Sequence, residues 1–426
     1  MSVRLKADLV LENIGELATP AASGKPARRG DAKRLLVSRN VCVAAGKGKI
    51  LYLGKPEGMD DVVKLTDSTV VMDLEGRLVT PGFVDCHTHP LYYGDRADEF
   101  AMRAAGADYE EIAAAGGGIL NSVARTRKAS REQLEETLRK HLLTMLRYGT
   151  TTVEVKSGYG LDLETESRCL DVVTNFAENW PQTIRRTFLG AHEIPEEFRG
   201  RSDDFIEFLI SEVLPEIKKR NLADFVDIFC EKGVFDPDQA ARYLSKAAEM
   251  GFGVRIHADE FHDTGGAAVA VEVNAMSADH LLSISDENVS RIAASDTVAT
   301  LLPGTALFLG KDFPDGRKLL DAGAAVAIAT DLNPGSCYCE SMPFMVNLAV
   351  CACGFTVEEA LTAATLNSAA ALGLEHRKGS LARGMDADMI IWDLNDYRGI
   401  AYHMAIPDIA HLIVSGEVFT EPEGNR

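Results

Sequence analysis

Eight short apolar runs recur along the middle of the chain, each followed by polar residues and a stretch with helical periodicity. They span residues 78–89, 150–157, 186–192, 225–231, 253–257, 277–280, 297–303 and 325–331. The spacing of roughly 31 residues per unit suits a β-strand followed by a crossover helix. Eight such units in succession are what a (β/α)8 barrel requires. The sequence therefore predicts an α/β fold built on a TIM barrel.

The character of these runs favours a parallel sheet that is covered on both faces. Most of them are continuously apolar and do not alternate with polar residues. Amphipathic segments at 131–147, 202–220 and 237–250 suit helices packed outside the strands. A doubly wound sheet is the alternative architecture. It would not gather residues from every strand around one axis.

The two ends of the chain have a different pattern. Short strand-like pieces separated by turn-prone sequence lie within residues 34–76 and return near the C-terminus. We expect one small β-sandwich domain built from residues 1–79 and 380–426, with the barrel at 80–379. Residues 16–33 are rich in Ala, Gly, Pro and Arg, which predicts a mobile loop insertion.

Composition excludes several classes of function. The chain has 426 residues, of which 46% are hydrophobic and 25% charged, a mix typical of soluble globular proteins. Its formal net charge of −20 disfavours nucleic acid and anionic membranes as partners, because both need a basic surface. No apolar run reaches about 18 residues, and the N-terminus has no secretion signal. We therefore expect a cytosolic protein.

The eight cysteines are too sparse for a disulfide framework, so reduced thiols are expected in such a chain. The pairs Cys337-x-Cys339 and Cys351-x-Cys353 leave a four-cysteine zinc site as an alternative. This spacing is unusual for structural zinc, and the second pair lies in an apolar helical run. Free thiols are therefore the favoured interpretation.

Ionisable residues close six of the eight apolar runs: His89, His192, Glu231, His257, His280 and Asp331. In a TIM barrel the carboxyl ends of the strands form the active-site face, so these residues are expected to converge. His87 and His89 alternate along a predicted strand and would face the same side, about 6.5 Å apart. With His257 and Asp331 they form a nitrogen and oxygen donor set suited to Zn²⁺ or Fe.

The string Pro81–His89 resembles the strand-one motif of the amidohydrolase superfamily, metal-dependent hydrolases on (β/α)8 barrels. Four further strings, Gly94–Phe100, Val155–Leu161, His257–Phe261 and Ala329–Ser336, resemble the imidazolonepropionases within it. The resemblance implies hydrolysis of 4-imidazolone-5-propanoate to N-formimidoyl-L-glutamate in histidine breakdown. It also implies one Zn²⁺ or Fe ion per chain, held by His87, His89, His257 and Asp331.

The residues expected to contact the substrate are Arg96, Tyr159, His192, Glu260, Asn333, Gly335 and Ser336. The propanoate group makes the substrate an anion, and the guanidinium of Arg96 has the fork geometry that a carboxylate needs. Glu260 is placed to bond a ring N–H. Exposed backbone N–H groups after Asp331 could hold the carboxylate that forms when the ring opens.

The expected chemistry needs hydroxide at neutral pH, which a bound metal ion supplies by lowering the pKa of water. Attack on the ring carbonyl creates an oxyanion that requires a donor. His192 and His280 are candidate donors and proton carriers. Either Asp331 or His280 could be the general base, and Glu260 completes the expected catalytic set.

Some superfamily members hold two metals through a carbamylated lysine on strand four. Lys232 directly follows Glu231 at the end of that predicted strand. Because it lies one place beyond the strand end, and because imidazolonepropionases are understood to be mononuclear, one metal is favoured.

Two other functions stay open at this point: a related cytosine or guanine deaminase, and a non-catalytic barrel that serves in binding or assembly. The complete set of four metal ligands disfavours the non-catalytic alternative. A homodimer is expected because twofold pairs are the commonest oligomers.

Overall fold

Eight parallel strands form the centre of the protein in the computed structural model, which describes residues 4–107, 111 and 117–421. The strands are β8 (Phe83–Asp85), β9 (Thr150–Lys156), β10 (Thr183–Ala191), β11 (Phe225–Cys230), β12 (Gly253–Ala258), β13 (Ser277–His280), β14 (Val298–Leu301) and β15 (Val326–Ile328). Each pairs in parallel with the next in chain order. All eight lie within or overlap the predicted runs.

Backbone contacts between the first and last strands close this sheet. The amide of His89 donates to the carbonyl of Leu332 at 2.8 Å, and the amide of Asp331 donates to the carbonyl of His87 at 3.0 Å. The carboxylate of Asp85 accepts from the Thr330 amide at 3.1 Å. The sheet is therefore a closed barrel, and the predicted α/β TIM-barrel class is confirmed.

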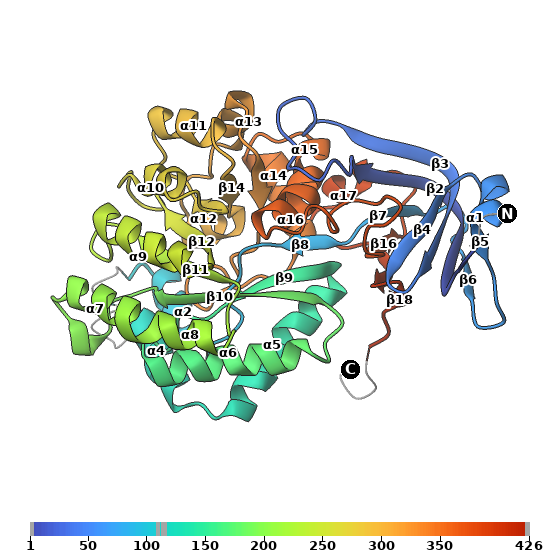
Figure 1. Ribbon diagram of the computed structural model, residues 1–426. Helices are drawn as coiled ribbons and strands as arrows, with labels where there is room; N and C mark the ends of the chain where they lie inside the picture. Colours follow the sequence, from blue (N-terminus) through green and yellow to red (C-terminus); the bar gives the residue numbers. More distant parts are fainter. Residues whose placement is uncertain (1–3, 108–110, 112–116, 422–426) are drawn as a thin grey trace.

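Helices surround the barrel (Figure 1). They are α2 (Ala97–Ala104), α4 (Ile119–Lys128), α5 (Arg131–Arg147), α6 (Leu163–Ala177), η2 (Glu196–Phe198), α7 (Ser202–Phe208), η3 (Leu209–Val213), α8 (Leu214–Lys219), α9 (Pro237–Glu249), α10 (Gly266–Glu272), α11 (Asp286–Ala293), α12 (Pro303–Leu309), α13 (Gly316–Ala322), α14 (Met342–Ala352), α15 (Val357–Thr362), η4 (Ala363–Asn367), α16 (Ser368–Ala371) and, nearer the β domain, α17 (Arg398–Tyr402). Among the described residues, none of these helices is both long and apolar enough to cross a membrane.

Local sequence explains why the helices form where they do. Helix α5 begins after Ser130, whose hydroxyl accepts from the Gln133 amide while the Gln133 side chain returns to the Ser130 amide. This reciprocal cap satisfies two backbone donors that a helix end would otherwise leave open. Leu134, Leu138 and Leu142, spaced four apart, are buried on one face. The predicted helix at 131–147 is confirmed with the same bounds.

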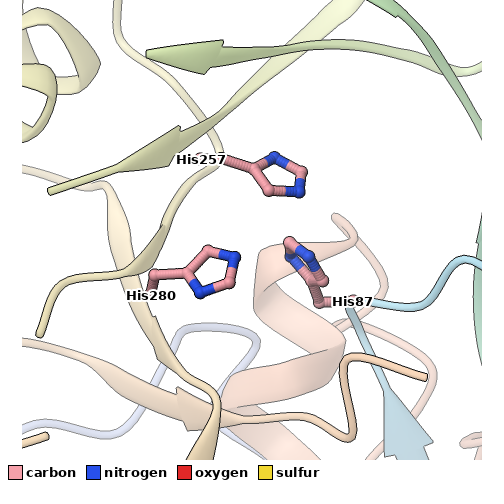
Figure 2. A group of neighbouring side chains, drawn as sticks. All are labelled: His87, His257 and His280. Carbon is pink, nitrogen blue, oxygen red and sulfur yellow. The ribbon is translucent and has the colours of Figure 1, made fainter. Parts of the chain in front are cut away.

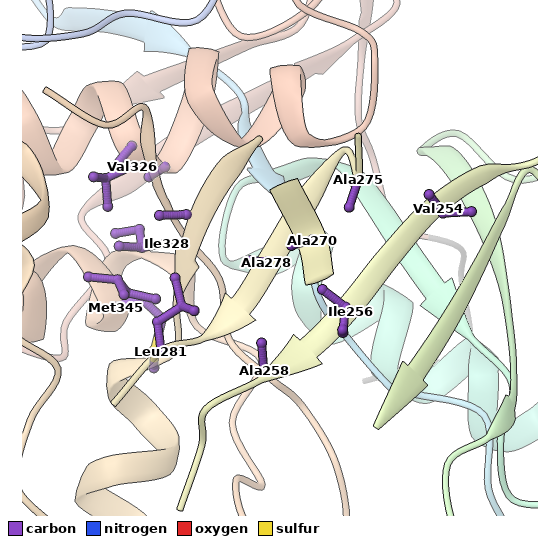
Figure 3. Packing of buried hydrophobic residues seen from close by; sticks show 14 of the residues in the cluster. Val254, Ile256, Ala258, Ala270, Ala275, Ala278, Leu281, Val326, Ile328 and Met345 are labelled. Atoms are coloured by element: carbon purple, nitrogen blue, oxygen red, sulfur yellow. The ribbon is translucent and has the colours of Figure 1, made fainter. Parts of the chain in front are cut away.

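Strand alternation separates the apolar shell from the polar interior of the barrel. In β12, Val254, Ile256 and Ala258 belong to the apolar cluster that includes helix residues such as Ala270, as Figure 3 shows. The intervening Arg255 and His257 turn toward residues of other strands inside the barrel. Alternate side chains of this one strand therefore pack against the helices on one face and form polar contacts inside the barrel on the other.

The two ends of the chain together form a β domain (Figure 1, right). Its elements are β1 (Leu5–Lys6), β2 (Leu9–Pro20), β3 (Leu35–Gly46), β4 (Lys49–Gly54), η1 (Pro56–Gly58), α1 (Met59–Val62), β5 (Val63–Lys64), β6 (Val70–Asp73), β7 (Leu78–Pro81), β16 (Met389–Trp392), β17 (Ile409–Val414) and β18 (Glu417–Val418). One sheet has the order β18-β17-β16-β7-β2-β3-β4, with β6 on β2, and β1 pairs with β5. Side chains from both chain ends share one apolar core there. The exact division at 79/80 and 379/380 stays a prediction.

The first predicted run is divided between two sheets. Residues 78–81 pair with β16 and β2 in the β domain, and only 83–85 belong to the barrel. Gly82 lies between them, where a Cβ atom would come within 2.3 Å of the Thr151 hydroxyl. His87 and His89 therefore follow the strand, and the prediction that they are strand residues is wrong.

The prediction of a loop insertion at 16–33 is wrong for its first five residues. Residues 16–20 are part of β2, and Thr19 is buried. Ala27 is buried as well: its amide donates to Asn367 Oδ1 at 2.7 Å, and its carbonyl accepts from Asn367 Nδ2 at 3.0 Å. Residues 21–26 and 28–31 are exposed or half-buried, as a loop predicts, and Ala27 anchors this loop to Asn367.

Candidate metal centre and active site

Four buried side chains meet at the carboxyl ends of the barrel strands. His87 and His89 follow β8, His257 lies in β12, and Asp331 follows β15; each is at most 3% exposed. The Nε2 atom of His89 lies 3.3 Å from that of His87 and 3.4 Å from that of His257. Asp331 Oδ1 lies 3.4 Å from His87 Nε2 and 3.5 Å from His89 Nε2. The structure thus brings together the four residues expected to bind metal.

These spacings fit a tetrahedral metal ion. Donor atoms at about 2.0–2.2 Å from a common centre are separated from one another by about 3.3–3.6 Å. The Nδ1 atoms of His87 and His257 bond to carboxylates of Asp279 at 2.7 Å and Asp227 at 3.1 Å. Each carboxylate accepts the Nδ1 proton, so both Nε2 atoms present lone pairs to the centre. Converging lone pairs repel unless a cation lies between them, so the residues fit Zn²⁺ or Fe.

His280 belongs to the same cluster. Donor atoms of His87, His257 and His280 lie within 4.8 Å of one another, and so do those of His87, His89 and Asp331. Figure 2 shows the rings of His87, His257 and His280 turned toward a common space. His280 Nε2 lies 3.6 Å from Glu260 Oε2. It therefore stands between the metal donors and the loop that carries Glu260.

Backbone strain marks these strand ends. His280 and Leu281 have φ angles of 80° and 59°, and Asp331 has 54°. Residues with side chains rarely adopt this left-handed region, and such strain concentrates at functional sites. The strained backbone aims His280 and Asp331 at the centre of the barrel mouth.

Burial sets the protonation of the site. It lowers the pKa values of His192 and His280 to about 4, so both rings are neutral at pH 7. His192 Nδ1 donates to the carbonyl of Gly158 at 3.0 Å, which leaves its Nε2 free. Burial raises the pKa of Asp331 to about 7 and that of Glu260 well above its usual range. A bound cation would hold Asp331 as a carboxylate.

A cavity of about 430 Å³ opens above the metal donors. Every residue predicted from sequence to act in binding or catalysis lines it except His87, which lies beneath it. The lining residues are His89, Arg96, Glu99, Arg103, Ala107, Gly118, Ile119, Tyr159, His192, Phe229, His257, Glu260, Phe261, His280, Leu309, Lys311, Asp331, Asn333, Gly335 and Ser336. A cavity of this size suits a small-molecule ligand.

Arg96 lines the same cavity and is the N-cap residue of α2. Its Nε and Nη2 atoms donate to Glu99 Oε2 at 2.8 and 2.7 Å. A Cβ atom at Gly335 would come within 2.2 Å of Arg96 Nη1. Glycine at 335 therefore leaves the space that the guanidinium occupies. The ring of buried Tyr159 lies beside those of His89 and His192, at 6.3 and 5.4 Å between centroids.

The loop after Asp331 folds around its own asparagine. Asn333 Oδ1 accepts from the amides of Gly335 and Ser336 at 2.8 and 2.7 Å. Asn333 Nδ2 donates to the carbonyl of Asp331 at 2.8 Å and to the Ser336 hydroxyl at 2.8 Å. The two amides that were expected to be exposed are thus already bonded. A ligand carboxylate would have to compete with Asn333 for them.

Sequence reasoning missed Arg103 as a residue of the site. Its guanidinium lies 5.7 Å from the Phe100 ring centroid and 5.2 Å from that of Phe308, and it borders the cavity. Its Nη2 atom is buried, with no hydrogen-bond partner among the described residues. The spacing of seven residues from Arg96, two turns along α2, is the signal that could have revealed it.

Glu231 and Lys232 do not line the cavity. Glu231 accepts from the amides of Phe261 and His262, at 2.9 and 3.3 Å, and so anchors the loop that carries Glu260. Lys232 is exposed. No lysine from strand four therefore reaches the metal donors within the described part of the chain.

The eight cysteines are free thiols. Within the described residues, no cysteine joins a group able to hold a metal ion. The alternative of a four-cysteine zinc site finds no support in this arrangement.

The model of the amidohydrolase family matches residues 78–419. An imidazolonepropionase of Porphyromonas gingivalis strain W83 is 43% identical over 96% of this chain and 97% of its own. One from Rubrobacter xylanophilus is 44% identical over 96% and 97%. The chain belongs to the imidazolonepropionase family of amidohydrolases. The resemblance seen in the sequence motifs is therefore confirmed, and the family is one of enzymes.

Solved structures share the fold of this imidazolonepropionase family member at much lower identity. An adenosine deaminase from Xanthomonas campestris with bound zinc has a TM-score of 0.68 and 16% identity, covering 98% of this chain and 93% of its own. A triazine hydrolase from Arthrobacter aurescens has a TM-score of 0.72 and 17% identity, covering 97% and 94%. A guanine deaminase from E. coli has a TM-score of 0.67 and 18% identity, covering 97% and 99%. At this identity the likeness concerns the fold alone.

Proposed function

We propose that this protein is an imidazolonepropionase that hydrolyses 4-imidazolone-5-propanoate to N-formimidoyl-L-glutamate in histidine degradation. The observation that carries the proposal is the set of four donor side chains, linked by donor-to-donor distances of 3.3–3.5 Å, next to a cavity that Arg96 also lines. Relatives with this name are 42–44% identical over nearly the whole chain. A metal centre and a cation that border one cavity suit a cyclic amide that bears a carboxylate.

The resident metal in this proposal is one Zn²⁺ or Fe ion per chain, held by His87, His89, His257 and Asp331. Three imidazole nitrogens and one carboxylate oxygen suit either metal. Exposed Lys232 supports a single ion, since a second would need a bridging ligand. Metal analysis should give one equivalent per chain; two equivalents, reduced to one in Lys232→Ala, would contradict this.

A divalent ion in this position makes hydroxide available near neutral pH and polarises a carbonyl oxygen. Asp331 is the general base in our proposal, because it touches two ligand imidazoles and its Oδ2 accepts from the Thr305 hydroxyl at 2.5 Å. That hydrogen bond fixes the position of Asp331 Oδ2, while Asp331 Oδ1 faces the Nε2 atoms of His87 and His89. Asp331 takes the proton from the attacking water and delivers it to the ring nitrogen that leaves.

Neutral side chains around the cavity would stabilise the oxyanion that forms at the ring carbonyl. His280, neutral at pH 7, donates to that oxygen from beside the metal donors. His192, whose Nδ1 proton is bonded to the Gly158 carbonyl, presents the lone pair of Nε2 beside the His89 ring and accepts a hydrogen bond from a ring N–H of the substrate. Glu260, whose raised pKa favours the protonated acid, both accepts from a ring N–H and donates an O–H. Together these groups orient the ring and confine the charge.

The chain as a whole carries a net charge of −20, which repels an anion at long range. Cations in the cavity itself must therefore bind the anionic substrate. Among the residues that the structure describes, Arg96, Arg103 and Lys311 are the cations that border the cavity. Arg96 is already held by Glu99, which fixes the direction of its remaining N–H groups. The guanidinium forms the paired bonds that a carboxylate accepts. Asn333, Gly335 and Ser336 would bind the carboxylate that appears on ring opening, provided that it displaces Asn333 Oδ1 from the amides of Gly335 and Ser336.

The decisive experiment incubates the purified, metal-loaded protein with 4-imidazolone-5-propanoate and follows the products by NMR and an ammonia assay. N-formimidoyl-L-glutamate without ammonia is the expected result. Ammonia release, or turnover of cytosine or guanine in its place, would indicate a deaminase. No turnover of any of these by metal-loaded protein would favour a binding protein.

Replacing Arg96 by alanine should raise KM about 10- to 100-fold and change kcat less, because the lost ion pair to the propanoate contributes about 1.5–3 kcal/mol. Arg103→Ala should raise KM in the same direction. Steady-state kinetics measures both. Arg131→Ala, on the exposed surface of α5, is the control and should match the wild type. An unchanged KM in Arg96→Ala would contradict the carboxylate clamp.

We also propose a homodimer formed by a second copy of this chain. Three apolar side chains after and within α17 are unusually exposed: Tyr402 by 90%, Met404 by 53% and Ile406 by 55%. They adjoin a largely apolar depression that Val350 and Val357 also line. Contiguous exposed apolar surface marks an interface, and twofold pairs are the commonest assemblies.

Light scattering should therefore give twice the mass of one chain for the wild type. Tyr402→Asp should shift the population to monomer at micromolar concentration. Leu65→Asp, an exposed position in the β domain, is the control and should leave the mass unchanged. A dimer that tolerates Tyr402→Asp would place the interface elsewhere.

The compartment proposed for the enzyme is the cytosol. All eight cysteines are free, and six of them are buried, as expected where thiols stay reduced.

A further inference from the structure

Beneath the metal donors, the interior of the barrel holds charged side chains that the catalytic steps above do not use. They are Glu154 and Lys156 of β9, Asp227 of β11, Arg255 of β12 and Asp279 of β13, all 0% exposed. Branched apolar side chains usually fill the core of a TIM barrel. Burying ions is costly unless each one is paired. Five buried charges in one place therefore require a specific explanation.

The five residues form a continuous chain of contacts. Lys156 Nζ donates to Asp227 Oδ2 at 2.7 Å and to Glu154 Oε1 at 2.8 Å. The same Glu154 oxygen lies 3.2 Å from Arg255 Nε. Arg255 Nη2 donates to Asp279 Oδ2 at 3.0 Å. We call this series, from Asp227 through Lys156, Glu154 and Arg255 to Asp279, the charge chain.

Each end of the charge chain contacts a metal donor. Asp227 accepts from His257 Nδ1 at 3.1 Å, and Asp279 accepts from His87 Nδ1 at 2.7 Å. A carboxylate at Nδ1 fixes the tautomer and the orientation of the ring. His87 and His257, supplied by different strands, are thereby tied to one rigid internal scaffold. The remaining bonds of Arg255, to the carbonyls of Cys86 and Ala371, anchor that scaffold to the backbone.

The charges also balance a divalent ion. Three carboxylates and two cations leave the charge chain with one net negative charge. Asp331 adds a second at the metal position itself. An ion of charge +2 would neutralise the buried centre, which a low-dielectric interior strongly favours. Without Lys156 and Arg255, the same site would hold an excess of negative charge.

We propose that the charge chain positions the metal donors and sets their affinity for a divalent ion, with Lys156 acting through Asp227 on His257. This inference rests on the metal centre of the proposed function. Lys156 is a positioning residue, because it touches neither the metal donors nor the cavity lining. Its removal leaves the Asp227 carboxylate without its cation. Without the bond from Lys156 Nζ to its Oδ2 atom, the Asp227 carboxylate is free to rotate and no longer fixes the orientation of the His257 ring.

Zn²⁺ affinity tests the inference in full-length protein, by competition with a chromophoric chelator. Lys156→Met and Asp227→Asn should each weaken Zn²⁺ binding about 10- to 100-fold. The double variant Lys156→Met/Asp227→Asn should bind Zn²⁺ no more weakly than the single variant with the lower affinity. Both substitutions interrupt the same series of contacts from Lys156 through Asp227 to His257, so their effects should not add. Additive losses in the double variant would contradict an action through Asp227.

A matched control separates positioning from general stability. Lys378 is equally buried and lies 3.0 Å from Asp386, at the border of the β domain. Lys378→Met should lower the melting temperature as Lys156→Met does, yet leave Zn²⁺ affinity within twofold of the wild type. Equal losses of affinity in both variants would reduce Lys156 to a structural role and overturn the inference.

Two further outcomes keep the test decisive. If Lys156→Met does not fold, Asp279→Asn tests the other end of the charge chain, because it preserves side-chain volume and should weaken Zn²⁺ binding by the same range. A wild-type protein that binds no Zn²⁺ would overturn the proposed metal centre together with this inference. Normal wild-type binding with unchanged affinity in every variant would overturn the inference alone.

Discussion

Replacing His257 by alanine should abolish both metal binding and turnover. The Nε2 atom of His257 lies 3.4 Å from that of His89 at the centre of the donor set, and the barrel offers a metal no open replacement from the same strand. Loss of the metal removes at least about 4 kcal/mol of transition-state stabilisation, a decrease on the order of 10³-fold or more in kcat/KM. Metal analysis and steady-state kinetics on the same preparation measure both effects.

His262→Ala is the matched control for His257→Ala. This histidine lies five residues further on, and its side chain is 56% exposed and bonded to Glu231. It should retain metal and activity. Chelator-treated wild-type protein should regain activity when Zn²⁺ is restored, whereas His257→Ala should not. Full activity of His257→Ala would disprove the proposed mechanism.

Asp331→Asn should lower kcat about 10²- to 10⁴-fold, because the amide removes the base that accepts the proton of the attacking water. The substitution preserves volume in a position that is only 2% exposed, so the fold should persist. It also removes one negative donor, and metal affinity should fall as well. Rates measured at saturating metal and substrate isolate the effect on kcat from the effects on binding.

Asp312→Asn controls for the loss of one acidic group near the mouth of the barrel, since Asp312 is exposed and lies outside the cavity lining. Its kinetics should match the wild type. His280→Gln distinguishes the two bases considered from sequence. A larger loss of kcat in His280→Gln than in Asp331→Asn would transfer the role of base to His280.

The positions of the metal donors could be predicted from sequence because a barrel makes sequence order into spatial order. Each strand contributes its carboxyl end to one face, so a residue such as His257 needs only a correct strand assignment to be placed. The same logic placed Asp331, 74 positions further along the chain by its number, next to it. Local signals, such as the Ser130 and Gln133 cap, fixed helix α5 equally well.

What the sequence left hidden depends on side-chain partners across the barrel. Glu154 and Lys156, or Arg255 and His257, alternate in otherwise apolar strands, and that alternation was a usable signal of inward charges. Which of them would pair could not be derived, because the pairing depends on strand stagger. The division of residues 78–89 was hidden for a similar reason, since both halves have strand propensity and only tertiary pairing assigns them to different sheets.

The shared β sheet affects how the chain reaches its final structure. Strand β7, near the beginning, pairs with β16, near the end, and the Leu381 amide donates to the Thr19 hydroxyl across 362 positions of sequence. During synthesis β2, β3, β4, β6 and β7 can pair with one another early, but the edge of β7 that pairs with β16 stays unpaired until almost the whole polypeptide exists. Contacts of such long range slow folding, and unpaired strand edges meanwhile invite association with other chains. Assembly of this domain is consequently a late event, completed only after β16, β17 and β18 have been translated.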